Sequence, residues 1–94
     1  MTTYLMYGKY SAQALKEISV QRTDRAVRLV EQLGGKVKDV YATLGEHDLV
    51  FIVEMPDAET AIKASVALTK LIGVTLSSTP AVPVEEFDRI MSEI

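Results

Sequence analysis

The only histidine of the chain, His47, lies between two acidic residues, Glu46 and Asp48. An imidazole that a carboxylate orients can act as a general base, so His47 is a candidate catalytic residue. The apolar residues that follow predict a strand from residue 47 to residue 55, and neighbouring strand residues point to opposite faces. His47 and Asp48 therefore cannot work as an adjacent pair. Turn chemistry also explains the segment, with Gly45 at positive φ, Glu46 solvated and Asp48 accepting hydrogen bonds from backbone amides.

Other signatures of catalysis or metal binding are missing from the sequence. The chain has no cysteine, which excludes disulfides and thiolate chemistry. One histidine with scattered carboxylates does not match the ligand spacing of metal sites. Ser77-Ser78-Thr79 lacks the glycine elbow of a serine nucleophile, and no phosphate loop or dinucleotide-binding fingerprint occurs. The sequence therefore predicts no metal and no cofactor, and it leaves open whether the protein is an enzyme.

Length and charge narrow the class of protein. Residues 1–94 are expected to form a single domain. The 10 basic residues are spread along the chain among 13 acidic ones, for a net charge of −3, which argues against a nucleic-acid-binding surface. The longest apolar run, residues 49–53, is too short to cross a membrane. We expect a cytosolic protein that binds neither nucleic acid nor membrane.

Caps, glycines and β-branched runs predict alternating strands and helices. Ser11, Thr23 and Asp57 are predicted N-caps, and Gly34 and Gly73 are predicted to end the longer helices. The strands are expected at residues 3–10, 36–44, 47–55 and 74–81, with a tight turn at Gly45-Glu46 and a short last helix from Pro83 to Ile94. This order predicts an α+β fold, the ferredoxin-like βαββαβ plait with a C-terminal helix, in which the helices pack on one face of the sheet.

The third predicted strand is apolar on both faces. Leu49 and Phe51 point one way, and Val50 and Ile52 point the other. A plait covers only one face of its sheet with helices, so the other face should be polar unless something covers it. We therefore expect the protein to pair with itself through the open sheet face, as a homodimer or a higher oligomer. The alternative is that the C-terminal helix, which has an apolar stripe of its own, folds back over the sheet.

A ligand site is expected between two paired sheets. On the predicted alternation, His47 lies on the open face at the mouth of this space. The candidate ligand-binding residues expected on that face are Tyr4, Met6, Tyr10, His47 and Phe51. Further polar ends that could touch a ligand belong to Tyr7, Lys9 and Tyr41. A small apolar or aromatic molecule would suit such a space, although side chains on apolar strand faces usually pack against each other.

Five segments together resemble a known family. They are TYLMYGKYS at the start, a helix ending in LGG, the strand region YATLGEHDLVFIVEMP, the small-residue helix KASVALTKL and the ending TPAVPVEEFDRI. Over about its full length the chain resembles the GYD domain family, which is named for a glycine-tyrosine-aspartate signature. Gly45 and Asp48 match this motif, whereas His47 stands where a tyrosine is expected. The resemblance implies a dimeric α/β barrel, in which two plaits pair through their sheets, and it implies no particular reaction.

Two functions remain open from the sequence. The first is a homo-oligomeric cytosolic domain that binds a small apolar or aromatic ligand, or that serves as an assembly or regulatory module. The alternative is a small dimeric-barrel enzyme of the monooxygenase or isomerase type. It would use His47 with Tyr4 or Tyr10 in a cleft between the sheets. The first is preferred because a convincing catalytic set is missing.

Overall fold

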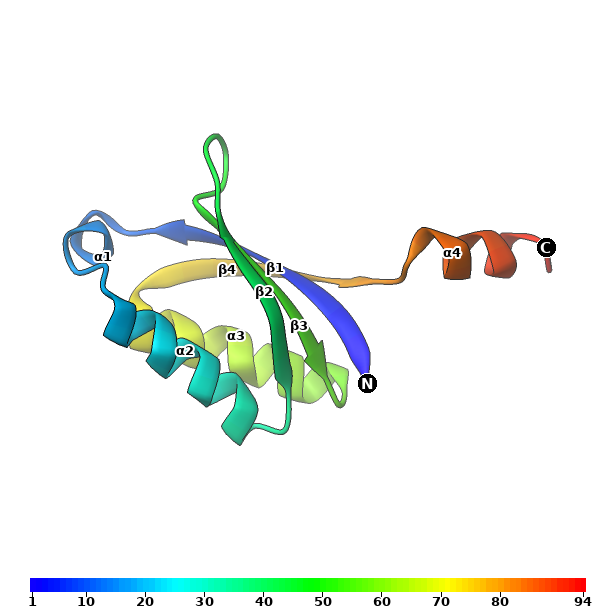
Figure 1. The fold of residues 1–94 in the computed structure, drawn as a ribbon, viewed down its shortest axis with the longest axis horizontal. Coiled ribbons are helices and arrows are strands. Elements are labelled where there is room, and N and C mark those ends of the chain that lie inside the picture. The colour runs from blue at the N-terminus through cyan, green and yellow to red at the C-terminus, as the bar shows by residue number, and fades with distance from the viewer.

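The computed structural model describes residues 1–94 as one sheet with two long helices on one side and a projecting C-terminal helix (Figure 1). The elements in chain order are β1 (Thr2–Tyr10), α1 (Ala12–Lys16), α2 (Val20–Gln32), β2 (Lys36–Ala42), β3 (Leu49–Met55), α3 (Ala58–Ile72), β4 (Val74–Ala81) and α4 (Val84–Met91). None of these helices is long and apolar enough to span a bilayer.

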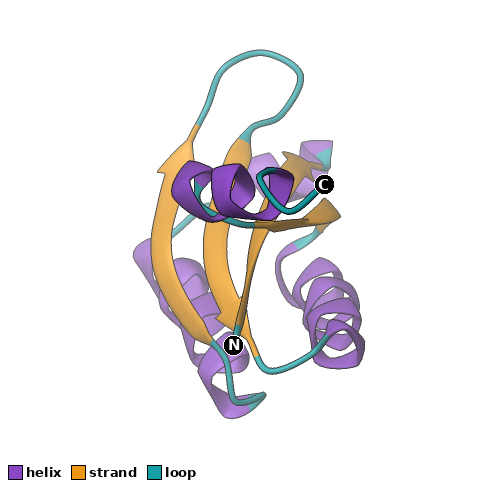
Figure 2. Cartoon of the chain, turned by 90° about the vertical axis from the view of Figure 1, so that its right-hand side faces the viewer, coloured by secondary structure: helices purple, strands orange, loops and turns teal.

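The sheet has the strand order β2-β3-β1-β4, and every neighbouring pair is antiparallel. β1 and β3 therefore occupy its centre, with Tyr7 opposite Val50 and Leu5 opposite Ile52. Helices α2 and α3 lie side by side on one face, and the opposite face carries no element (Figures 1 and 2). The predicted ferredoxin-like plait is confirmed by this topology.

Local hydrogen bonds explain where the helices begin and end. The Asp57 carboxylate accepts a bond from the Thr60 N–H at 2.7 Å, and Gly73 closes α3 in the left-handed conformation at φ 68°. The Ser11 hydroxyl accepts from the Ala14 N–H in the same way at the start of α1. All three positions agree with the sequence prediction.

The start of α2 differs from the prediction. The N-cap is Ser19, whose hydroxyl accepts from the Arg22 N–H at 3.2 Å, and the helix begins at Val20. The predicted cap at Thr23 was therefore wrong. Thr23 lies inside the first helical turns, where its hydroxyl donates back to the Ser19 carbonyl oxygen. A polar segment at an exposed helix start resembles a helix break in sequence, because both are solvated.

The core lies between the sheet and the two long helices. Strand β3 contributes alternate residues to it, and three alanines of α2 and α3 let these helices approach the sheet closely. The buried residues of this core are Tyr4, Met6, Ala26, Val30, Leu49, Phe51, Val53, Met55, Ala61, Ala64, Leu68, Ile72 and Val74. Gly8 belongs to the same layer, because a Cβ there would stand 2.5 Å from Cγ1 of Val74.

The connection between β2 and β3 is longer than predicted. β2 ends at Ala42 and β3 begins at Leu49, so residues 43–48 form an open loop instead of a tight turn at Gly45-Glu46. His47 precedes the strand and is not part of it. Gly45 has the expected positive φ, at 122°. The loop closes through a backbone bond from the Thr43 N–H to the Asp48 carbonyl oxygen at 2.9 Å.

The C-terminal helix does not fold back. α4 extends past the end of the sheet, away from α2 and α3, and none of its residues is buried (Figure 1). The alternative cover for the open sheet face is therefore wrong for this conformation, and the face remains uncovered in the single chain.

Candidate functional site

Asp48 ties the β2–β3 loop to the end of β1. Its backbone N–H donates to the Gly8 carbonyl oxygen at 2.8 Å, and its carboxylate Oδ2 accepts from the Tyr10 N–H at 3.0 Å. Lys9 Nζ lies 3.9 Å from the same carboxylate oxygen. The hydrogen bond from Tyr10 confirms the predicted role of Asp48 as an acceptor for backbone amides, and it makes this residue a structural clamp.

His47 lies against an aromatic ring of the open sheet face. Its imidazole centroid is 5.0 Å from that of Tyr7, with an angle of 35° between the two planes. Its backbone carbonyl oxygen accepts from the Thr43 hydroxyl at 2.7 Å, which fixes the loop beneath the ring. The Asp48 carboxylate is directed to Tyr10 and Lys9. His47 is therefore half-buried beside Tyr7, apart from any carboxylate that could form a catalytic pair with it.

The other predicted ligand residues lie on the wrong face for an inter-sheet site. Tyr4, Met6 and Phe51 are buried beneath α2 and α3 in the core. Tyr10 also packs against this core. The prediction that these four residues share the open face with His47 was wrong, because His47 lies in a loop and does not continue the alternation of β3.

The open face carries a second apolar set. Cross-strand pairing places Tyr41, Val50, Tyr7 and Ser77 in one row and Ile52, Leu5 and Thr79 in the next. The apolar centre of this face consists of Leu5, Tyr7, Val50 and Ile52. Each of these side chains remains partly exposed to solvent. Tyr7 and Tyr41 were noted in the sequence only for their polar ends, and the cross-strand register is what brings them into one row with His47 nearby.

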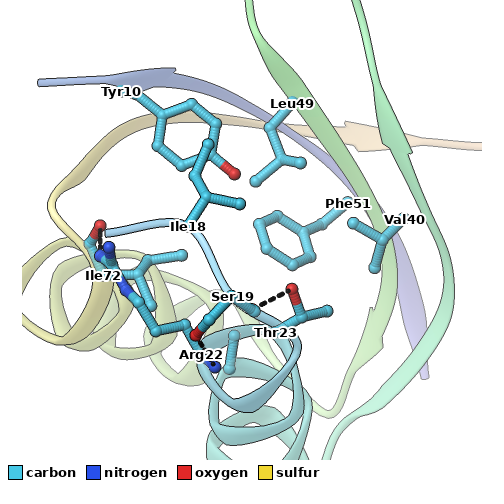
Figure 3. Close-up of a pocket in the computed structure, with 10 residues that line it drawn as sticks. Tyr10, Ile18, Ser19, Arg22, Thr23, Val40, Leu49, Phe51 and Ile72 are labelled. Atoms are coloured by element: carbon cyan, nitrogen blue, oxygen red, sulfur yellow. Dashed lines mark hydrogen bonds between the residues drawn. The ribbon is translucent and has the colours of Figure 1, made fainter. Parts of the chain in front are cut away.

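A small cavity lies on the helix side of the sheet, between the start of α2 and the central strands (Figure 3). Tyr10, Ile18 and Phe51 line it, together with the polar side chains of Ser19 and Arg22. About 30 Å³ of it is accessible to water, which is room for one or two water molecules. Two predicted ligand residues thus do line a cavity, but it is too small for an aromatic molecule and does not include His47.

Arg22 holds one wall of this cavity in place. Its guanidinium donates to the Ala14 carbonyl oxygen at 3.2 Å and to the Ile72 carbonyl oxygen, which lie at the C-terminal ends of α1 and α3. A cation there offsets the partial negative charge of both helix ends. Burial raises the pKa of the Tyr10 hydroxyl above its ordinary value of 10.0, the Arg22 charge opposes this rise, and Asp48 adds to it. Both terminal nitrogens of the Arg22 guanidinium donate to backbone carbonyl oxygens, which indicates a structural role.

The fold is shared with known regulators. The structure of the leucine response regulatory protein of Mycobacterium tuberculosis is 16% identical in sequence, with a TM-score of 0.59; the match covers 87% of this chain and 51% of that one. An AsnC family transcriptional regulator from Agrobacterium tumefaciens is 18% identical, with a TM-score of 0.58, and the match covers 87% and 50%. The chain thus spans about half the length of these proteins, and at this identity the likeness shows the fold alone.

The sequence comparisons are more specific about the family. None of the curated proteins matches the sequence. The model of the GYD domain matches residues 4–91. This match includes the loop with Gly45 and Asp48, the central strands and α4. The chain belongs to the GYD domain family.

Proposed function

We propose that this chain is a cytosolic regulatory domain that works as a homodimer, or a higher oligomer, joined through its open sheet face, and that it binds a small apolar or aromatic ligand there. The observation that carries this proposal is the cluster Leu5, Tyr7, Val50 and Ile52 on a face that no element covers. Half-wet antiparallel sheets normally place polar residues on the solvated side. A second copy offers the same apolar cluster and can cover it symmetrically.

The size of the open face sets the expected affinity. Four strands about 4.8 Å apart and about seven residues long cover roughly 450 Å². If about half of this area is apolar on each subunit, pairing removes about 450 Å² of apolar surface from water. At ~25 cal/mol per Å² this contributes on the order of 11 kcal/mol before costs. Association itself costs about 4–15 kcal/mol, so face pairing alone gives a dimer of modest affinity.

The ligand would bind at the His47 end of this face. The His47 and Tyr7 rings contact each other there, and Tyr41 stands in the same cross-strand row. Aromatic rings with polar edges can stack on a flat ligand while the imidazole and hydroxyl groups orient it. The likeness in fold to transcriptional regulators supports a regulatory role by analogy.

A matched pair of substitutions tests the pairing. Ile52→Glu places a charge in the centre of the open face, and Ile62→Glu places the same charge on the outer side of α3, where Ile62 is 65% exposed. Sedimentation velocity from 1 to 100 µM should show dimers for the wild type and Ile62→Glu and monomers for Ile52→Glu. Backbone amide spectra check that each variant is folded. Dimers of equal stability in both variants would refute pairing through this face.

Ligand binding needs its own test, with indole as the probe. Addition of indole should change the backbone amide chemical shifts of Tyr7, Tyr41 and His47. The changes should be smaller in monomeric Ile52→Glu. Native mass spectrometry of the freshly purified protein would detect a co-purified molecule. Shifts confined to Ile18 and Ser19 would place binding at the helix-side cavity and contradict the proposed site.

The contact between His47 and Tyr7 also favours the second candidate function, a small dimeric-barrel enzyme. In that case Tyr7 takes the place expected for Tyr4 or Tyr10, because Tyr7 contacts the imidazole on the open face whereas Tyr4 and Tyr10 pack into the core. His47→Gln would then abolish turnover and leave the oligomer and the indole shifts at Tyr41 intact. Loss of the indole shifts in this variant would instead assign His47 to ligand binding.

A further inference from the structure

The C-terminal helix α4 is a second apolar surface without a partner. Its side chains at positions 87, 90 and 91 follow helical spacing and so form one stripe, which Ile94 continues in the turn after the helix. Phe87 is 50% exposed and Ile94 is 91% exposed, and no residue of the helix is buried. The charged residues Glu85 and Arg89 lie on the opposite side of the helix. An amphipathic helix of this kind normally lays its stripe against another surface.

α4 lacks what an isolated helix would need. Helices shorter than about 12–15 residues are marginal in water even with favourable sequences, and this one has eight. No side chain caps its N-terminus. Its ion pairs join Arg89 to Glu86 and Glu93 and are exposed to solvent, where such pairs add little. The helix therefore depends on a surface that covers its stripe.

The body of the same chain does not provide that cover. Only Val82 and Pro83 connect β4 to α4, and Pro83 has an extended conformation, with φ −59° and ψ 151°. This connection continues the direction of β4, so α4 lies beyond the end of the sheet (Figure 1). The stripe is therefore not packed against the core of its own chain.

We propose that α4 is an exchanged arm, whose apolar stripe packs against the second copy of the chain in the homodimer. This proposal rests on the proposed pairing through the open sheet face. A stable dimer buries about 800 Å² per subunit, whereas that face offers roughly 450 Å². A helix of eight residues is about 12 Å long and about 10 Å wide, which adds ~120 Å² for the arm that a subunit gives and as much for the arm that it receives. The total of about 700 Å² approaches the usual size.

Charge is compatible with packing of the arm on the body of a second copy. The residues 84–94 contain four acids and one arginine, a net charge of −3 that equals the net charge of the whole chain. Residues 1–83 are therefore neutral as a unit. The exposed lysines beside the open face, Lys9 and Lys38, are each paired with an acid, Asp48 at 3.9 Å and Glu54 at 3.8 Å, so they leave the face without a net positive charge. A neutral body does not repel an acidic arm, whereas two acidic arms repel each other, so the arm is directed to the body of the second copy and away from its arm.

Removal of the arm tests the proposal. A chain that ends at Pro83 should fold, because α4 adds nothing to the core, and amide spectra would show this. Its dimer dissociation constant should rise at least tenfold over the wild type. Phe87→Ser in the stripe should weaken the dimer in the same direction, whereas Glu85→Ser on the opposite side of the helix should change it less than twofold.

The exchange itself is visible by isotope-filtered NOE spectroscopy on a mixture of labelled and unlabelled wild-type chains. We expect intermolecular contacts from the methyl groups of Ile90 and Met91. Contacts only within one chain would overturn the exchange. If Ile52→Glu dissociates the dimer and the shortened chain keeps the wild-type dissociation constant, the exchanged arm is refuted and pairing through the open sheet face is supported. A wild-type chain that is monomeric at 100 µM overturns both.

Discussion

Replacement of Asp48 by alanine tests whether the family's aspartate is a structural clamp. In the folded chain its carboxylate accepts the Tyr10 N–H at 3.0 Å and lies 3.9 Å from Lys9 Nζ. The variant loses both interactions and keeps the backbone bond from residue 48 to the Gly8 carbonyl oxygen. The end of β1 should therefore loosen while the rest of the sheet remains paired.

The expected loss follows from these two contacts. A hydrogen bond to a charged group contributes about 1.5–3 kcal/mol, and the lower part of this range applies because the Asp48 side chain is 30% exposed. The ion pair with Lys9 is solvated and contributes at most ~0.5 kcal/mol. We expect Asp48→Ala to lower the free energy of unfolding by about 2 kcal/mol. For a domain of this size that corresponds to a fall in Tm of about 10 °C.

Urea unfolding and amide hydrogen exchange measure this effect. Lys9→Ala is the matched control, since it removes only the ion pair and should cost less than ~0.5 kcal/mol. Asp48→Asn keeps an oxygen that can accept the Tyr10 N–H and should fall between the two. The Tyr10 amide should exchange faster in Asp48→Ala. A loss below ~0.5 kcal/mol with an unchanged Tyr10 amide would refute the clamp, because a hydrogen bond to a charged group is worth more than that.

Three further outcomes follow from the packing and the caps. Gly8→Ala should cost about 1–3 kcal/mol by urea unfolding, because the new methyl group would stand 2.5 Å from Val74 Cγ1, and a cost near zero would contradict the close packing of β1 on β4. Ser19→Ala should cost about 1 kcal/mol as the cap of α2, and Thr23→Ala clearly less; the reverse order would move the helix start. Hydrogen bonds from Thr60, first from its side chain and then from its backbone N–H, lower the pKa of Asp57 below its ordinary value of 3.8. The ionised form is therefore favoured by folding, and the stability it contributes is present above pH 3.8 and lost as the pH falls through the lower folded pKa. Asp57→Asn, which keeps a cap, should lose less stability than the wild type between pH 5 and pH 3 in urea unfolding, and equal losses would contradict this.

Local chemistry made most of the fold predictable. Ser11, Asp57 and Gly73 bond to backbone groups within four residues, so their roles are written in the adjoining sequence. The order of strands and helices then leads to the plait. Ser19 carries the same kind of signal as Ser11, and it was missed because the polar residues after it resemble a break.

The face of the sheet that lies beneath the helices was harder to predict. Both sides of β3 are apolar, so alternation separates Phe51 from Ile52 without showing which one meets the helices. The loop added a second error. Leu44 looks like a strand residue, yet it is fully exposed in an open loop, which shifts His47 out of the strand pattern. The pairing of His47 with Tyr7 depends on contacts between residues 40 positions apart, which no local pattern contains.

The most direct test of the account is the mass of the chain in solution. Sedimentation equilibrium at 1–100 µM should give a mass twice that of the 10.3 kDa chain for the wild type and the mass of one chain for folded Ile52→Glu. This result would tie the assembly to the apolar face that holds Leu5, Tyr7, Val50 and Ile52. A wild-type chain that stays at 10.3 kDa up to 100 µM would contradict the account.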